Sequence, residues 1–380
     1  MKVVVAIDSF KGSLSSIEAG QAVKAGVLAA HPDANVIIKP LADGGEGTTD
    51  AFIEGLGGQR IDLTVTGPMG SPVSCYYGYL EKDKTAIIEM ASASGITLVP
   101  AHQKNPLTAS TRGVGEMIIH ALEKGCRHFI IGIGGSATND GGVGMLQSLG
   151  FRFLDRDGKE VERGGKYLAD IADVDVSGAL KELGECVFKI ACDVDNPLCG
   201  PRGASHIYGP QKGASYEDAV ILDSALENFA HVTKEKLGVD CADSEGSGAA
   251  GGLGYAFRAY LNGELKPGAE IVLDETGIDK ALEGADYLIT GEGRIDSQTA
   301  MGKAPAGAAA RAKKAGALVI GIAGCVTDDA YLCNDKGIDA IFPVIDKAMS
   351  LEEAMDRETT VKNIKKAVTQ IFRLIDSVKK

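Results

Sequence analysis

The chain has 380 residues, 44% of them hydrophobic, and its 39 basic and 52 acidic residues give a formal net charge of −13. This length exceeds what one ordinary domain needs and predicts two. The negative charge and the absence of Trp argue against nucleic acid and anionic membranes as partners. The apolar start, residues 1–7, is too short for a signal peptide or a membrane span, so we expect a cytoplasmic protein.

Short apolar runs recur along the chain, with turn residues close behind them. Runs of this length that are apolar on both faces are typical of parallel strands covered by helices on both sides. They span residues 3–8, 36–41, 129–133, 188–192, 287–290, 318–324 and 340–345. Helical spacing of apolar residues is found at 15–30, 111–124, 302–315 and 351–378. This alternation predicts an α/β fold with a doubly wound parallel sheet.

Residues 60–89 break the alternation. They contain three short strand-like runs separated by turn residues, which predict hairpins rather than strand–helix–strand units. We infer a second α/β domain with a mixed sheet, inserted into the first, so that both chain ends build one Rossmann-like sheet. The predicted boundaries assign 1–66 and 285–380 to the first domain and 67–284 to the second.

Four loops rich in Gly and in acidic or amide residues directly follow predicted strands. They are residues 42–48, 134–142, 193–198 and 291–299. In open α/β sheets, ligands bind beyond the carboxyl ends of the strands, so four such loops on one edge predict a polar pocket. Each loop alone also suits an ordinary turn, because Gly, Asp and Asn are turn residues. The four together favour the pocket.

The loop GGSATNDGG, residues 134–142, has the composition of a phosphate-binding turn. Successive glycines let backbone amides converge on an anion, and Ser136 and Thr138 add hydroxyl donors. The loop is not a P-loop, because G-x-x-x-x-G-K-[ST] occurs nowhere in the chain. The H-R-D and D-F-G motifs of protein kinases are also missing.

The same stretch also fits an alternative, an NAD-dependent oxidoreductase. Gly132, Gly134 and Ala137 form a G-x-G-x-x-A pattern after a predicted strand, as in dinucleotide-binding folds. Against this alternative, residues 139–142 are polar and flexible where the first helical turn of such a fold packs on the sheet.

Carboxylates outnumber the other candidate groups near these strand ends. Magnesium prefers oxygen ligands, and the hydroxyl that accepts a phosphoryl group needs a carboxylate to take its proton. The candidates are Asp8, Asp43, Glu46, Asp140, Asp193, Asp195, Glu292 and Asp296. Histidines lie outside the loops, so we expect no zinc site.

Two basic residues, Lys11 and Arg294, closely follow predicted strands and suit the binding of phosphate or carboxylate. Lys11 equally suits a solvated loop, and Arg294 an internal salt bridge with Asp296. The small-residue stretch GAAGGLG, residues 248–254, suits either tight helix packing or the lining of a ligand cleft.

Six motifs, in chain order, together resemble class I glycerate kinases. They are DSFKGS (8–13), LADGGEGT (41–48), GIGGSATNDGG (132–142), CDVDNPL (192–198), GAAGGLG (248–254) and ITGEGRIDSQT (289–299), and the match covers nearly the whole chain. The resemblance implies two α/β domains with the active site in the cleft between them. It also implies transfer of the ATP γ-phosphate to D-glycerate with Mg²⁺, in the breakdown of glyoxylate and sugar diacids, and it favours the 2-phosphate as product.

The chemistry of each residue then suggests its role in this reaction. Residues predicted to hold the ATP phosphates are Gly134, Gly135, Ser136, Thr138 and Asn139. Residues predicted to be catalytic are Asp193 as the base and Lys11 and Arg294 as neutralising cations. Residues predicted to bind the substrate are Asp8, Asn196 and Asp296, and those predicted to bind the metal are Asp43 and Glu46.

A third hypothesis is a sugar-acid-binding protein without turnover. The many carboxylates oppose it, because anion binding favours cations and amides whereas metal-assisted transfer needs acids. The sequence leaves open the oligomeric state, a homo-oligomer included, and the preference for glycerate over a related hydroxy acid.

Overall fold

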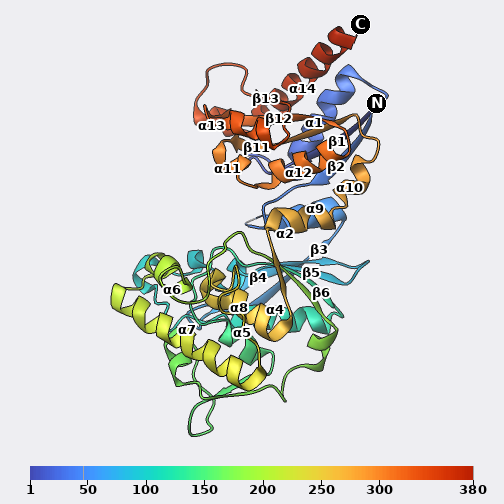
Figure 1. Cartoon of the computed structure of the whole chain (residues 1–380). Helices are drawn as coiled ribbons and strands as arrows, with labels where there is room; N and C mark the ends of the chain where they lie inside the picture. The colour runs from blue at the N-terminus through green and yellow to red at the C-terminus, as the bar shows by residue number, and fades with distance from the viewer. Residues whose placement is uncertain (46, 380) are drawn as a thin grey trace. The chain divides into compact units, whose positions relative to one another are not determined.

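The computed structural model describes residues 1–45 and 47–379, which form two compact units (Figure 1). Unit 1 comprises Met1–Asp43, Asp50–Gly57 and the chain from Ala269 onward. Unit 2 comprises Gly44–Thr49 and Gly58–Gly268. Within the described residues, no helix is both long enough and apolar enough to span a membrane.

Unit 1 is built on a five-stranded parallel sheet with the strand order β13-β12-β11-β1-β2. The strands are β1 (Lys2–Ile7), β2 (Asn35–Pro40), β11 (Tyr287–Ile295), β12 (Leu318–Val326) and β13 (Ala340–Pro343). The N-terminal strand β1 lies between β2 and β11, so both ends of the chain contribute to one sheet. The predicted Rossmann-like sheet is therefore confirmed.

Helices cover both faces of this sheet because its strands are apolar on both faces. In β1, Val4 and Ala6 belong to one core and Val3 and Val5 to the other. The first core is closed by α9 (Gly268–Glu275), α10 (Ile278–Leu282) and α12 (Ala304–Lys314), and the second by α1 (Ser16–Ala30) and α14 (Arg357–Lys379). The shorter helices are α2 (Thr48–Leu56), α11 (Ser297–Ala300), α13 (Leu351–Met355) and the 3₁₀ helix Ala330–Lys336.

The first and last long helices pack against each other, as their blue and red ribbons show in Figure 1. A Cβ atom on Gly26 of α1 would lie 2.8 Å from the Lys365 carbonyl oxygen, so the close approach requires glycine there. The predicted helix at 351–378 is in fact two helices, α13 and α14. The backbone is extended at Asp356 between them, and its side chain accepts a hydrogen bond from the Thr359 N–H at 2.9 Å.

Unit 2 contains a six-stranded mixed sheet with the order β10-β9-β6-β5-β4-β3. The strands are β3 (Gln59–Thr66), β4 (Pro72–Leu80), β5 (Thr85–Glu89), β6 (His128–Gly132), β9 (Val187–Ala191) and β10 (Glu264–Lys266), and β7 (Arg152–Leu154) and β8 (Asp173–Asp175) form a small separate hairpin. Strands β3, β4 and β5 pair antiparallel, and the remaining pairs are parallel. The predicted mixed sheet is confirmed.

The division between the units differs from the predicted boundaries. Strand β3 pairs with β4 along its whole length, so residues 59–66 belong to unit 2 rather than to the first domain. Conversely, helices α9 and α10 bury Leu273, Ile278 and Leu282 in a core of unit 1, which moves the second boundary from 284 to 268. Hydrogen bonding and burial thus set both divisions, and neither is marked by a change in composition.

One large apolar core closes unit 2 around the sheet. Phe129 of β6 and Phe188 of β9 stack there with their ring centroids 4.8 Å apart. The α-helices are α3 (Ala91–Ser94), α4 (Arg112–Glu123), α5 (Val143–Ser148), α6 (Ala204–Tyr208), α7 (Tyr216–Leu237) and α8 (Ala249–Leu261). Short 3₁₀ helices lie at Ile96–Leu98, Ala101–Gln103, Gly165–Asp170, Lys181–Glu185 and Pro210–Lys212.

Candidate active site

Two of the predicted loops lie side by side at the edge of the unit 2 sheet. Gly132, the last residue of β6, pairs with Glu89 of β5 on one side and with Ala191 of β9 on the other. The three strands are parallel, so Glu89, residues 133–142 and residues 192–198 all emerge at the same carboxyl edge. The structure thus brings loops 134–142 and 193–198 together as predicted.

A third predicted loop, residues 42–48, also reaches this edge. A Cβ atom on Gly132 would lie 2.6 Å from the Gly44 carbonyl oxygen, and one on Gly44 would lie 2.9 Å from the Ala191 Cβ. The Thr49 N–H donates to Glu89 Oε1 at 2.9 Å. Gly44 therefore lies beside the ends of β6 and β9, and Thr49 lies beside the end of β5. The predicted metal ligand Glu46 lies outside the described residues.

The exposed part of loop 134–142 is its glycine turn. Gly134 and Gly135 are exposed, and Gly135 has φ +74°, a conformation that favours glycine. The Gly135 carbonyl accepts from the Ile96 N–H at 2.8 Å, which fixes the turn from behind. Among the described residues, neither the Gly134 nor the Gly135 N–H has a hydrogen-bond acceptor. Two consecutive amides are therefore available to an anion.

The other predicted phosphate-binding residues are buried. Ser136 is 6% exposed, and Thr138 and Asn139 are fully buried. The Asn139 Nδ2 donates to Ser205 Oγ at 2.9 Å. In this conformation the side chains of Thr138 and Asn139 offer no surface to a ligand, and they support the loop from within unit 2.

Asp140 fixes the same loop. It is fully buried, and its carboxylate accepts from the Thr111 N–H at 2.8 Å, the Thr111 hydroxyl at 2.9 Å and the N–H groups of Gly142 and Gly144, each at 3.2 Å. Burial raises the pKa of Asp140, while these hydrogen bonds act in the opposite direction. The residue is thus a structural anchor and does not face solvent as a metal ligand would.

The loop after β9 presents Asp193 and uses Asn196 internally. Asp193 is exposed, and its Oδ1 accepts from the Gly268 N–H at 3.0 Å, which orients the carboxylate. The amide of Asn196 donates to the Arg202 carbonyl at 2.7 Å and accepts from the Tyr208 hydroxyl at 2.5 Å. The Asp193 carboxylate is therefore accessible at this edge, whereas the Asn196 side chain is used within unit 2.

The stretch GAAGGLG, residues 248–254, packs tightly against both loops at the start of α8. A Cβ atom on Gly251 would lie 2.1 Å from the Thr138 carbonyl oxygen, and one on Gly248 would lie 2.1 Å from the Pro197 carbonyl oxygen. These contacts agree with the packing interpretation of the motif. They also explain how the two loops are held beside each other.

In unit 1, three acidic residues, Asp8, Asp43 and Glu292, lie near the carboxyl ends of β1, β2 and β11. Asp8 and Glu292 are 8% and 9% exposed, and the Asp8 N–H donates to the Gly291 carbonyl at 2.8 Å. Burial raises the pKa of Asp8 to about 7, and the charges of Asp43 and Glu292 add to this effect. Lys11, which is exposed, opposes it.

The remaining predicted residues of unit 1 pair with each other. Arg294 Nε lies 3.3 Å from Asp296 Oδ2, which is the internal salt bridge considered as its alternative role. Asp296 also caps α11, accepting from the Gln298 N–H at 2.9 Å. Arg294 is nevertheless 64% exposed at its side chain, so it retains surface for an anion.

The acidic residues fit a magnesium ion only in part. Among residues 1–45 and 47–379, no three His, Cys, Asp or Glu side chains are grouped to hold a metal by themselves. Magnesium in phosphoryl-transfer sites typically has one or two carboxylate ligands, with phosphates and waters as the rest. A divalent cation bound near Asp8, Asp43 and Glu292 would relieve their mutual electrostatic repulsion, so these residues would suit such a shared site.

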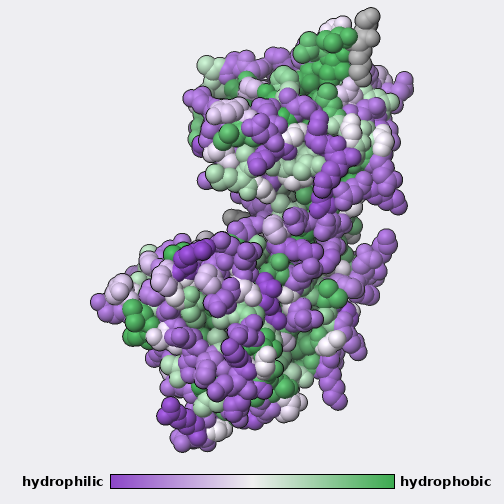
Figure 2. Space-filling model, in the orientation of Figure 1, coloured by the Kyte–Doolittle hydropathy of each residue, from purple (hydrophilic) through white to green (hydrophobic). Residues whose placement is uncertain are grey.

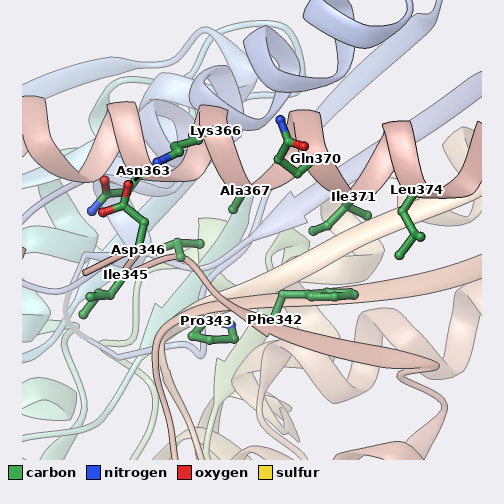
Figure 3. A pocket seen from close by; sticks show the side chains of 11 residues that line it. Phe342, Pro343, Ile345, Asp346, Asn363, Lys366, Ala367, Gln370, Ile371 and Leu374 are labelled. Atoms are coloured by element: carbon green, nitrogen blue, oxygen red, sulfur yellow. Dashed lines mark hydrogen bonds and ion pairs between the residues drawn. The ribbon is translucent and has the colours of Figure 1, made fainter. Parts of the chain in front are cut away.

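Of two cavities in the described part of unit 1, only the smaller is lined by a predicted site residue. A cavity of about 330 Å³ lies between β13 and α14, where Phe342 faces Ile371 and Leu374 (Figure 3), and it contains none of the predicted site residues. A smaller one, of about 120 Å³, is lined by Phe10, Lys11 and Gly293. Lys11 is the one predicted site residue among the described residues that line it.

Comparison with known proteins identifies the family. The model of the glycerate kinase family matches residues 3–376. The chain belongs to this family. It is 49% identical to glycerate 2-kinase of Escherichia coli K12 and 47% identical to glycerate kinase of Bacillus subtilis 168, over 93% and 94% of this chain and 93% of each relative. A crystal structure assigned as glycerate kinase 2 from Salmonella typhimurium LT2 superimposes with a TM-score of 0.92, at 45% identity, over 100% of this chain and 99% of that one.

Membership of the glycerate kinase family makes this chain a kinase. The structure also argues against the alternative of an NAD-dependent oxidoreductase. In a dinucleotide-binding fold, the helix opens within the glycine pattern. Here residues 133–142 separate β6 from α5, so Gly134 and Ala137 lie in a long loop.

The sequence analysis did not predict two residues that contact the loops of this candidate site. Glu89 accepts the Thr49 N–H, but it ends a run that was interpreted as part of a hairpin. Lys212 is 2% exposed and donates to the Thr138 carbonyl at 2.7 Å. Its position in a Gly-Pro-Gln-Lys-Gly turn predicts an exposed lysine, and no local pattern indicates its burial.

Proposed function

We propose that the protein phosphorylates D-glycerate at the 2-hydroxyl, using ATP and Mg²⁺. The observation that carries this proposal is the meeting of three loops at one edge of unit 2. There the exposed amides of Gly134 and Gly135 follow a strand that neighbours the one preceding Asp193. Phosphoryl transfer needs anion-binding donors and a carboxylate near the acceptor hydroxyl, and this edge offers both.

Within this proposal, the backbone of residues 134–136 binds the ATP phosphates. Thr138 and Asn139 act from behind the loop, because their side chains are buried. Asp193 accepts the proton of the attacking hydroxyl, and its bond from the Gly268 N–H keeps the carboxylate oriented.

The acidic residues of unit 1 serve the same reaction in this proposal. Asp43, together with Glu46, holds magnesium, which when bound neutralises phosphate charge. Lys11 and Arg294 neutralise the glycerate carboxylate or the transferred group. Asp8, Asn196 and Asp296 are the proposed substrate residues. Of these, Asp8 has the clearest support, because it is held at a strand end and is electrostatically linked to Asp43.

The position of phosphorylation rests on one relative, the Escherichia coli protein named glycerate 2-kinase, which is 49% identical to this chain. The test supplies ATP, Mg²⁺ and D-glycerate and couples the product to enolase and pyruvate kinase without a mutase. We expect enolase substrate to form in step with ADP. ADP without enolase substrate would indicate the 3-phosphate, and no ADP would refute the proposal for this substrate.

A further inference from the structure

A buried lysine lies directly behind the proposed phosphate-binding loop. Lys212 ends the 3₁₀ helix Pro210–Lys212 in unit 2 and is 2% exposed. Lysines are rarely buried unless a partner compensates the ammonium. The Lys212 ammonium donates to the Thr138 carbonyl at 2.7 Å. It therefore contacts the backbone of the loop four residues beyond Gly134.

The segment that carries Lys212 anchors two loops of the site. Ser205 in α6 accepts from the Asn139 amide at 2.9 Å, and Tyr208 donates to the Asn196 side chain at 2.5 Å. Together with Lys212, the segment 204–212 thus contacts both the phosphate-binding loop and the loop that carries Asp193.

The carboxylate of Asp140 acts electrostatically on the Lys212 ammonium. Burial lowers the pKa of Lys212 to about 7, and the negative charge of Asp140 opposes this shift. Asp140 is the one described ionisable group that acts in this way on the ammonium. Lys212 thus joins the loop through its hydrogen bond to the Thr138 carbonyl and through the charge of Asp140, two residues further along the same loop. Without it, the Thr138 carbonyl would lose this donor in a fully buried position.

We propose that Lys212 is a positioning residue for ATP, which holds residues 134–140 so that the amides of Gly134 and Gly135 face the nucleotide phosphates. The inference rests on the proposed function, because it requires that this loop binds ATP. Lys212 does not contact the substrates and acts through the loop. Its loss should thus weaken the use of ATP and leave the binding of D-glycerate nearly unchanged.

The test compares Lys212→Met and Lys212→Gln in the full-length enzyme. Met keeps much of the apolar stem without the charge, and Gln keeps a neutral donor. The control is Lys234→Met, because Lys234 is exposed on α7 and paired with Asp240 at 2.7 Å. For each variant, KM for ATP and for D-glycerate are measured by ADP release, and folding is measured by circular dichroism.

We expect Lys212→Met to raise KM for ATP by about tenfold or more, and KM for D-glycerate by less than about twofold. Lys212→Gln should lie between Lys212→Met and the wild type, and Lys234→Met should match the wild type. An unchanged KM for ATP, or equal rises for both substrates, would overturn the inference. Loss of folding in both Lys212 variants would also overturn it, because the lysine would then serve the fold and not the loop. An inactive wild type would instead refute the proposed function.

Discussion

At the scale of single residues, the proposed role of Asp193 as the catalytic base can be tested directly. We expect Asp193→Asn to lower kcat by about 10²- to 10⁴-fold, because an amide cannot take the proton of the glycerate hydroxyl. KM for ATP should change by less than about threefold. The matched control is Asp195→Asn, since Asp195 is also exposed in this loop and pairs with Arg202 at 3.1 Å. Steady-state kinetics of both variants measure kcat and KM for ATP. An Asp193→Asn enzyme with wild-type kcat would remove this residue from the mechanism.

The raised pKa of Asp8 predicts how the stability of the protein depends on pH. Its pKa is about 7 in the folded protein and near 4 in an unfolded chain. Between these values the folded state binds a proton that the unfolded state has lost, so the free energy of unfolding falls as the pH rises from about 4 to 7. The full effect is on the order of 4 kcal/mol.

Asp8→Asn should remove this loss, because the amide has no charge to desolvate. Urea unfolding at pH 5 and pH 8, without magnesium, should therefore show a larger decline for the wild type than for the variant. Asp33→Asn provides the control, since Asp33 is an exposed residue of the same unit. Parallel declines in the wild type and in Asp8→Asn would contradict the expectation.

At the scale of elements, short glycine-rich stretches decide how the loops are held. Gly251 at the start of α8 has φ +69°, and a Cβ atom there would lie 2.1 Å from the Thr138 carbonyl oxygen. Gly251→Ala should displace loop 134–142, lower stability by roughly 1–3 kcal/mol and raise KM for ATP. Thermal unfolding and kinetics measure the two effects.

Gly184→Ala is the control for this substitution, because a Cβ atom at Gly184 would have no neighbour within 4 Å. It should leave both quantities unchanged. If Gly251→Ala also kept the wild-type KM for ATP, the packing of α8 on the loop would have no part in binding the nucleotide.

At the scale of the whole molecule, ligand protection can map the proposed site. Amide hydrogen exchange with and without Mg²⁺-ATP should slow in three separate stretches of unit 2, residues 44–49, 133–142 and 192–198. At an ATP concentration 100 times Kd, openings that release the ligand should become about 100-fold rarer. Mass spectrometry of peptides from these stretches gives the measurement.

The cavity between β13 and α14 is the alternative site that the same hydrogen-exchange experiment would detect. Figure 2 shows hydrophobic surface gathered at the C-terminal end of α14, where Leu374 is 58% exposed. Protection confined to residues 342–346 and 363–374 would place the nucleotide in this cavity and contradict the proposed site.

The sequence alone determined the fold class and the family. Strands apolar on both faces need helices on both sides, which is why runs such as 3–8 and 318–324 predicted a parallel sheet. Loops 134–142 and 193–198 were recognisable because each follows a strand, and the carboxyl ends of parallel strands share one edge. The fourth predicted loop does not share this edge, because residues 291–295 lie within β11 in the other sheet. The capping box that begins α1 is a local signal of the same kind, since it joins Ser15 and Glu18, residues three apart.

Only the tertiary structure decided which residues are partners across long separations. Lys212 and Thr138 are 74 residues apart, and their contact follows from the packing of segment 204–212 against loop 134–142 and not from any local pattern. The boundary at β3 is likewise decided by its pairing with β4. Asn139 was predicted to hold phosphate because of the loop around it, but the fold buries its side chain completely. Periodicity and turn chemistry are local properties of the chain, whereas burial and the pairing of polar groups depend on what the rest of the fold places beside them.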